Sequence, residues 1–198
     1  MNVLVTGANG QLGNEMRLMA QNSSHHYIFT DVEELDITDF NAILQTVKEK
    51  EIQIIVNCAA YTNVDKAEND FDTANALNNI AVGRLANVAK AQNATLIHIS
   101  TDYVFNGNNH IPYTEDDITD PIGVYGKTKL AGEETIKKVG CNYIILRTAW
   151  LYSKWGNNFV KTMQKLTLEK DSLSVIFDQI GSPTYAKDLA HAISDRKS

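Results

Sequence analysis

Short apolar runs alternate with longer amphipathic segments along most of this 198-residue chain. Most of the apolar runs are continuous, which is typical of strands buried on both faces of a parallel sheet. The expected strands span 2–6, 27–31, 52–60, 95–100, 142–148 and 173–177. The expected helices between them span 11–22, 39–50, 71–92, 126–139 and 157–168, each long enough for a crossover connection. The pattern predicts an α/β fold, a doubly wound parallel sheet of the Rossmann-like type.

The charge of the chain argues against a nucleic-acid or anionic-membrane surface. The formal net charge is -6 and the pI is near 5.3, whereas phosphate polymers favour clustered Lys and Arg. No run approaches the roughly 18 apolar residues of a membrane span, and we expect no leader, because an apolar strand starts at Asn2. Cys58 and Cys141 have no metal-like or CxxC spacing, so we expect reduced thiols in a cytoplasmic protein.

A glycine-rich turn follows the first expected strand. Gly7, Gly10 and Gly13 form a GxxGxxG sequence at the start of the first expected helix, a variant of the common GxGxxG fingerprint. Glycines there let the backbone turn tightly and approach a pyrophosphate at the helix N-terminus. The second expected strand ends at Asp31, whose carboxylate can accept hydrogen bonds from an adenosine ribose and would repel a 2′-phosphate. These features predict a dinucleotide site that favours NADH over NADPH.

Tyr125 directly precedes the expected helix at 126–139, and Lys129 follows it by four positions, so the two side chains share one face of that helix. Thr101 directly follows the fourth expected strand, at the sheet edge where ligands bind in such folds. Carbonyl reduction requires a proton donor as well as a hydride. We therefore expect Tyr125 to donate the proton, Lys129 to lower the pKa of Tyr125, and Thr101 to orient the carbonyl oxygen.

Five blocks of sequence carry a specific resemblance: "VNCAAYTNVDKAE", "HISTDYVFNG", "PIGVYGKTKLAGE", "RTAWLYSKWGNNF" and "DQIGSPTYAKDLA". Together with the glycine turn they resemble the extended short-chain dehydrogenase/reductase superfamily and, within it, the dTDP-4-dehydrorhamnose reductase family. The resemblance implies NAD(P)H-dependent reduction of a dTDP-4-keto-6-deoxysugar in dTDP-rhamnose and polysaccharide biosynthesis. It also implies a dTDP-sugar as substrate and the possibility of a homodimer and of Mg²⁺.

The resemblance implies roles for further residues. Gly10, Gln11 and Leu12 would line the pyrophosphate, and Asp31 would bind the ribose. The remaining cofactor contacts would come from Asp36, Ile37, Ala60, Tyr61 and Thr62, with Tyr125 and Lys129 at the nicotinamide end. Thr101, Asp102 and Trp150 would face the sugar.

The family pattern continues beyond the equivalent of Ser198, so we expect most of the C-terminal substrate lobe to be absent. We assign residues 1–150 to a dinucleotide-binding Rossmann-like domain. Residues 151–198 would supply the last strand and helix elements and the start of the incomplete lobe. The activity of such a chain stays open.

Two other functions remain open. A sugar-nucleotide dehydratase or epimerase would share the fold and the tyrosine–lysine pair, but Tyr103 stands where dehydratases place a glutamate. A non-catalytic nucleotide-binding regulatory subunit would share the fold without turnover. No metal site is expected from the residues themselves, because the five histidines show no paired ligand spacing.

Overall fold

The computed structural model describes residues 1–175 and 179–196. Five parallel strands form one sheet in the order β2-β1-β3-β4-β5. The strands are β1 (Asn2–Thr6), β2 (His26–Thr30), β3 (Ile54–Asn57), β4 (Thr95–Thr101) and β5 (Asn142–Thr148). From β1 the chain first adds β2 on one side of the sheet and then adds β3, β4 and β5 on the other side. The boundary between β1 and β3 is therefore the switch point where doubly wound sheets bind ligands. The expected fold class is confirmed.

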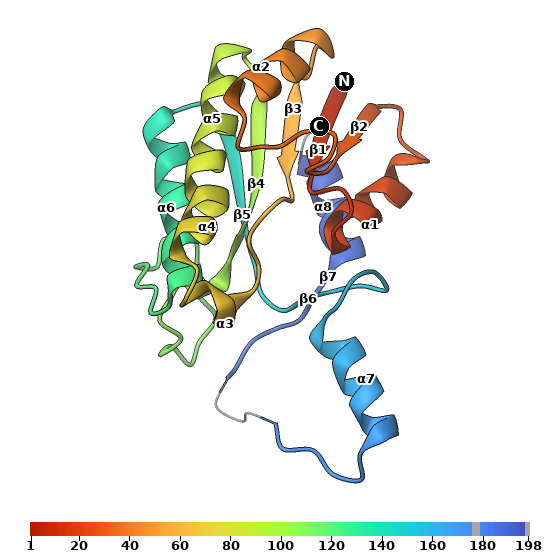
Figure 1. The fold of residues 1–198 in the computed structure, drawn as a ribbon, viewed down its shortest axis with the longest axis vertical. Helices are drawn as coiled ribbons and strands as arrows, with labels where there is room; N and C mark the ends of the chain where they lie inside the picture. Colours follow the sequence, from red (N-terminus) through yellow and green to blue (C-terminus); the bar gives the residue numbers. More distant parts are fainter. Residues whose placement is uncertain (176–178, 197–198) are drawn as a thin grey trace.

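Helices cover both faces of the sheet (Figure 1). One layer contains α2 (Phe40–Glu49), α5 (Ala81–Ala91) and α6 (Val124–Val139). The opposite layer contains α1 (Gln11–Ala20) and α8 (Ala186–Arg196). This arrangement gives the protein two hydrophobic cores, one on each side of the sheet.

Successive side chains of a strand enter opposite cores. Leu4 packs into the core under α2 and α5, whereas Val3 and Val5 pack into the core under α1 and α8. The same alternation separates Ile55 from Val56 on β3. Because both faces are covered, these strands are apolar throughout, and this is why the sequence shows continuous apolar runs.

The expected helix at 71–92 is divided into three consecutive parts. These are α4 (Phe71–Asn75), a π-helical turn η1 (Ala76–Ile80) and α5. The π-helical turn places the Asn78 side chain inside the protein, where it accepts the Tyr61 N–H at 2.9 Å and donates to the Tyr61 carbonyl at 3.1 Å. The extra residue in this turn therefore holds the segment that follows β3.

One expected strand is not found. Residues 173–175 of the run at 173–177 are outside any strand, and residues 176–177 lie outside the described part of the chain. The sequence also gave no sign of α3 (Val64–Ala67), the 3₁₀ turn η2 (Asp102–Val104) or α8. A parallel pair of two-residue strands, β6 (Leu151–Tyr152) and β7 (Thr184–Tyr185), was missed as well. Apart from α8, which has eleven residues, these elements are too short to show a periodicity.

The region after β5 has two parts that behave differently. α8 returns to the sheet, where Leu189, Ala190 and Ile193 join the core under α1. α7 (Phe159–Glu169) has no buried residue and lies apart from the sheet, beyond the carboxyl ends of the strands (Figure 1).

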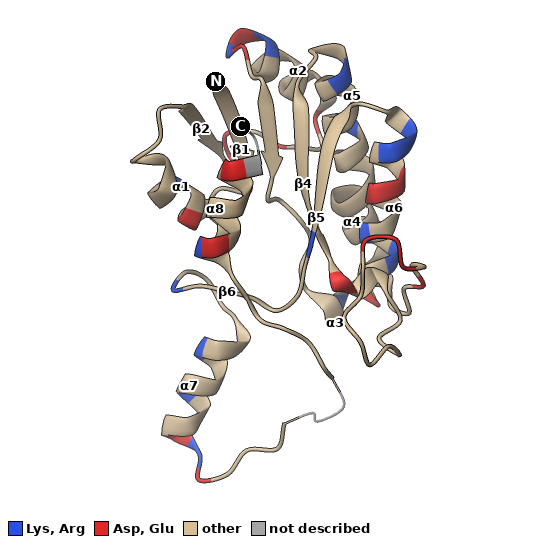
Figure 2. Ribbon diagram, turned by 180° about the vertical axis from the view of Figure 1, so that it is seen from behind, with Lys and Arg blue, Asp and Glu red and all other residues tan. Residues whose placement is uncertain are grey.

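None of the helices that the structure describes is long and apolar enough to cross a membrane. Lys and Arg are distributed over α2, α5, α6 and α7 (Figure 2).

Candidate active site

A cavity of about 1400 Å³ opens at the carboxyl ends of the strands. Its lining combines the glycine turn, the end of β2, the ends of β3 and β4, the start of α6 and the segment around α7. All but one of the residues expected to bind cofactor or substrate line this cavity. The exception is Tyr61, whose hydroxyl donates instead to Asp70 at 3.1 Å. The roles assigned to these residues stay predictions.

The glycine turn has no room for side chains at Gly7 and Gly13. Gly7 has φ +63°, and a β-carbon added to it would lie 2.6 Å from the Ala59 backbone nitrogen. A β-carbon on Gly13 would lie 2.5 Å from the Ala8 Cα. No side chain caps the start of α1 at Gly10, so the first N–H groups of this helix face the cavity and can bind an anion. The turn therefore fits a pyrophosphate.

Asp31 joins the glycine turn to the end of β2. Its carboxylate accepts the Asn9 N–H and the Val32 N–H, both at 2.9 Å. Asp36 accepts both the N–H and the hydroxyl of Thr38, and the backbone bond is the main reason that the pKa of Asp36 is lowered. Both carboxylates line the cavity, and a carboxylate oxygen can accept further hydrogen bonds from ribose or adenine.

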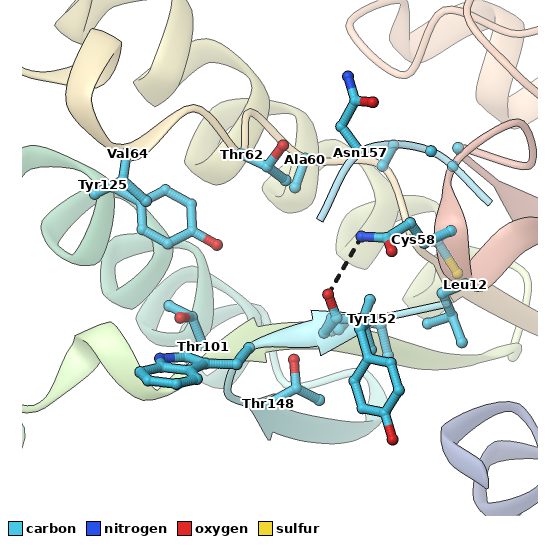
Figure 3. A pocket seen from close by; sticks show the side chains of 18 of the residues that line it. Leu12, Cys58, Ala60, Thr62, Val64, Thr101, Tyr125, Thr148, Tyr152 and Asn157 are labelled. Atoms are coloured by element: carbon cyan, nitrogen blue, oxygen red, sulfur yellow. Dashed lines mark hydrogen bonds between the residues drawn. The ribbon is translucent and has the colours of Figure 1, made fainter. Parts of the chain in front are cut away.

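Thr101 and Tyr125 come from different elements and point into the same cavity (Figure 3). Burial raises the pKa of Tyr125 to about 12, and the Thr101 hydroxyl, which favours the phenolate, opposes this rise. In this structure the Thr101 hydroxyl donates to Asp102 at 3.0 Å and accepts the Tyr103 N–H at 3.2 Å. Thr101 must turn its hydroxyl hydrogen away from Asp102 in order to donate to a substrate oxygen.

Lys129 is 1% exposed and lies on the inner side of α6. Its ammonium donates to the Ile99 carbonyl at 2.6 Å, and its Nζ lies 3.4 Å from Nε2 of His98. Burial lowers the pKa of Lys129 to about 8, although the charges of Glu133 and Cys58 oppose the shift. The Ile99 carbonyl of β4 therefore holds the Lys129 side chain at the back of the site.

The lowering of the Tyr125 pKa expected from Lys129 is not seen among the groups that this structure contains, and the role of Lys129 stays a prediction. The pKa of Tyr125 is raised, because removal of the phenol from water outweighs every favourable interaction. The nearby charge of Asp102 adds to the rise, and Lys129 is bound to Ile99 instead. Sequence spacing predicted a shared helix face and could not reveal the partner of the ammonium.

A buried ion pair fixes α6 against the sheet. Glu133 is fully buried and accepts two hydrogen bonds from Arg147 of β5, at 3.0 Å and 2.7 Å. It also accepts the Ser100 hydroxyl of β4 at 2.5 Å. Since Glu133 is one helix turn beyond Lys129, this pair sets the position of α6 relative to Thr101. The sequence analysis identified neither this pair nor its bond to Ser100, because the three residues are far apart in the chain.

Gln11 connects the glycine turn to the segment before α7. Its side-chain oxygen accepts the Ser153 N–H at 3.1 Å and the Asn158 amide at 2.9 Å, and its amide nitrogen donates to the Leu151 carbonyl at 3.4 Å. Gln11 therefore offers its backbone, rather than its side chain, to a bound anion. Trp150 lines the same side of the cavity and packs against Phe159, with ring centroids 5.8 Å apart.

The part of the chain that the structure describes contains no cluster of metal ligands. Within 1–175 and 179–196, no three His, Cys, Asp or Glu side chains gather in a way that could hold one. The described residues therefore offer no set of ligands for the Mg²⁺ that the resemblance implies.

Comparison with known proteins gives the family. The family model described as "RmlD substrate binding domain" matches residues 1–196. The chain belongs to this family. An RmlD-family relative, the dTDP-4-dehydrorhamnose reductase of Aggregatibacter actinomycetemcomitans, is 42% identical over 192 residues, which make up 96% of this chain and 65% of the relative.

Two solved structures are very similar to this chain. The dTDP-4-dehydrorhamnose reductase of Clostridium acetobutylicum is 46% identical with a TM-score of 0.95, and that of Bacillus anthracis, in complex with NADP, is 44% identical with the same score. The chain is covered to 98% in both comparisons and spans 69% of each of those chains. It thus spans about two thirds of the length of these relatives.

Proposed function

We propose that the site serves NAD(P)H-dependent reduction of the 4-keto group of dTDP-4-dehydro-L-rhamnose, which gives dTDP-L-rhamnose. The observation that carries the proposal is that Tyr125 and Thr101 face the cavity formed by the glycine turn. The proton donor and the expected dinucleotide cradle are therefore in one space. Membership of the RmlD family, whose relatives named above are dTDP-4-dehydrorhamnose reductases, supports this choice of reaction.

When bound, the dihydronicotinamide supplies the hydride that reduces the carbonyl carbon. Tyr125 gives its hydroxyl proton to the carbonyl oxygen, which becomes the alcohol oxygen of the product. The raised pKa of Tyr125 keeps the phenol protonated at neutral pH, as a proton donor requires. Thr101 orients the carbonyl oxygen by donating a hydrogen bond, and Lys129 is the buried source of the proton that restores Tyr125.

Either nicotinamide cofactor can satisfy this chemistry, and we propose that Asp31 favours NADH. The carboxylate stands at the end of β2, where an adenosine ribose is expected, and a 2′-phosphate placed there would be repelled. The NADP in the Bacillus anthracis structure shows that a relative binds the phosphorylated form. The preference of this chain therefore depends on how far a 2′-phosphate can avoid the carboxylate of Asp31.

The site supports a dehydratase less well. The residue after Asp102 is Tyr103, whose ring packs edge-on against Tyr125 with centroids 5.6 Å apart. A dehydratase needs a second acidic group beside the threonine for its elimination step, and a phenol with a raised pKa does not provide one.

A homodimer, a cytoplasmic location and a separate substrate lobe starting in 151–198 remain predictions.

The test is NADH oxidation with dTDP-4-keto-L-rhamnose, measured as loss of NADH absorbance. The assay compares this chain with a version extended by the C-terminal third of the Bacillus anthracis relative. We expect turnover in the extended version, with NADH bound by both. NADH binding without consumption in either version would contradict the proposal and favour a non-catalytic nucleotide-binding subunit.

A further inference from the structure

A row of buried polar side chains runs behind the candidate active site, across three neighbouring strands. It begins at Thr6 on β1, continues through Asn57 on β3 and His98 on β4, and ends at Lys129 on α6. Each of these side chains is at most 1% exposed. None of the steps proposed above uses Asn57 or His98. Buried polar groups of this kind are costly unless every member is paired, so their hydrogen bonds can be assigned in order.

The orientation of the Asn57 amide is fixed by a backbone group. The Ala59 N–H donates to Oδ1 of Asn57 at 3.2 Å, and a backbone N–H can act only as a donor. The Thr6 hydroxyl donates to the same oxygen at 2.7 Å. The other end of the amide, Nδ2, therefore carries the hydrogens and lies 3.1 Å from Nδ1 of His98.

This orientation determines where His98 carries its proton. Nδ1 of His98 must accept the hydrogen of Asn57, so it has no hydrogen of its own. The neutral ring then carries its hydrogen on Nε2, which faces Nζ of Lys129 at 3.4 Å. Burial holds the pKa of His98 well below its usual value, so the imidazole ring is neutral at neutral pH.

A hydrogen-bond donor that faces a lysine side chain favours one protonation state of the lysine over the other. An ammonium has three hydrogens and no lone pair, whereas a neutral amine can accept one hydrogen bond and still donate to the Ile99 carbonyl. We propose that His98, oriented by Asn57, is a positioning residue that presents its Nε2–H to Lys129 and stabilises the neutral amine. Lys129 then gives up a proton more readily when Tyr125 must be restored, a consequence that rests on the proposed function.

The other groups around Lys129 do not account for this preference. Glu133, on the same helix, and the Cys58 thiol, at the end of β3, both favour the ammonium. Glu133 is already paired with Arg147 of β5. Tyr125, one helix turn away, is a protonated neutral phenol. His98 is thus the one hydrogen-bond donor facing Lys129 in the hydrogen bonds of the described chain, while burial acts in the same direction.

The first test needs no variant and no substrate. Long-range proton–nitrogen correlation spectra of histidine-labelled protein distinguish a protonated ring nitrogen from an unprotonated one. Between about pH 6 and 8, we expect Nε2 of His98 to carry the hydrogen and Nδ1 to carry none. A ring protonated on Nδ1, or on both nitrogens, would overturn the proposal.

The second test measures the pKa of Lys129 from the carbon and nitrogen signals of its side chain. His98→Phe removes the Nε2–H, so we expect the pKa of Lys129 to rise. A fall would mean that His98 accepts a hydrogen bond from the ammonium, and no change would mean that His98 only fills space; either result rejects the proposal. His110→Phe, at an exposed histidine, should leave the pKa of Lys129 unchanged.

Two further variants serve as a replacement for His98→Phe and as a control for the tautomer measurement. His98→Leu replaces His98→Phe if the larger ring prevents folding, and the same rise is expected. Thr6→Val removes one bond to Asn57 but leaves the Ala59 N–H in place, so the His98 tautomer should stay as in the wild type. Both readouts are independent of turnover. A correct tautomer without NADH oxidation would therefore reject the reductase assignment alone, and an incorrect tautomer with oxidation would reject the role of His98 alone.

Discussion

Gly126 lies directly against the carbonyl oxygen of Tyr103, so closely that a β-carbon on Gly126 would overlap this oxygen. The contact joins the first turn of α6, which carries Tyr125, to the turn η2 that follows Thr101. The distance between the two hydroxyl-bearing segments thus depends on a residue without a side chain. Proximity of this kind is what places a proton donor beside a reacting oxygen.

Gly126→Ala is expected to push the start of α6 away from η2. The added methyl group cannot be accommodated without movement of two backbones, so we expect a loss of about 1–3 kcal/mol in the free energy of unfolding. Turnover of the extended protein should fall more than NADH affinity, because Tyr125 and Thr101 separate. Urea unfolding and the NADH assay measure the two effects. Lys127→Ala, at an exposed position on the same turn, is the control and should change stability by less than about 0.5 kcal/mol.

Tyr125→Phe tests the proton donor. The substitution removes one oxygen from a half-buried ring and should reduce kcat of the extended protein by a factor of about 10²–10⁴. Binding of NADH, measured by fluorescence titration, should be nearly unchanged. Tyr103→Phe is the matched control, because it removes a neighbouring phenol that also lines the cavity. A Tyr125→Phe protein with the wild-type rate would remove the central residue of the proposed mechanism.

Asp31→Ala tests the ribose contact. Without the carboxylate, the repulsion of a 2′-phosphate disappears, so we expect the ratio of NADPH affinity to NADH affinity to rise several-fold. The variant also removes the acceptor of the Asn9 N–H, and both affinities should fall somewhat. Glu33→Gln, an exposed acidic neighbour, controls for the loss of one negative charge. If the affinity ratio moved equally in both variants, Asp31 would have no special role.

Glu133→Gln tests the buried ion pair. The glutamine keeps the size of the side chain but removes the carboxylate bound to Arg147, and breaking a buried pair in this way costs about 3 kcal/mol or more. We expect the free energy of unfolding to fall by roughly that amount. The exposed neighbour Glu134 provides the control substitution Glu134→Gln, for which stability should hardly change. Equal stability of both variants would show that the pair does not brace α6.

Lys129→Met tests the burial of the lysine through the pH dependence of stability. The native pKa of about 8 lies below the ordinary value of 10.5, so between these pH values the unfolded chain binds more protons than the folded one. The stability of the wild type should therefore rise across this window, by roughly 3 kcal/mol in total from this group.

The methionine variant lacks this rise. The free energy of unfolding of the variant, relative to that of the wild type, should be greatest below about pH 8. This difference should shrink as the pH rises toward 10.5. Urea unfolding at a series of pH values measures the difference between the two proteins, and the ionisation of Tyr125 largely cancels in it. An advantage of the variant that grew with pH would mean that the native structure favours the ammonium.

The sequence by itself determined the architecture, because strands buried on both faces must be apolar along their whole length. Five of the six expected strands are present within two or three residues at most of their ends, and the doubly wound order follows from their alternation with helices. It also determined the glycine turn, since the backbone at Gly7 has a positive φ and no space for a β-carbon. Local conformation and burial pattern are properties that neighbouring residues encode directly.

Only the tertiary structure decided the electrostatics of the site. Lys129 was expected to act on Tyr125 because both lie on one helix face, yet its ammonium is bound to Ile99 of another element. Glu133, His98 and Asn57 were not expected in any role, because their side-chain partners are 14 to 51 positions away in the sequence. A pKa depends on burial and on the nearest charges in space. Those are fixed only when the strands and α6 have packed together.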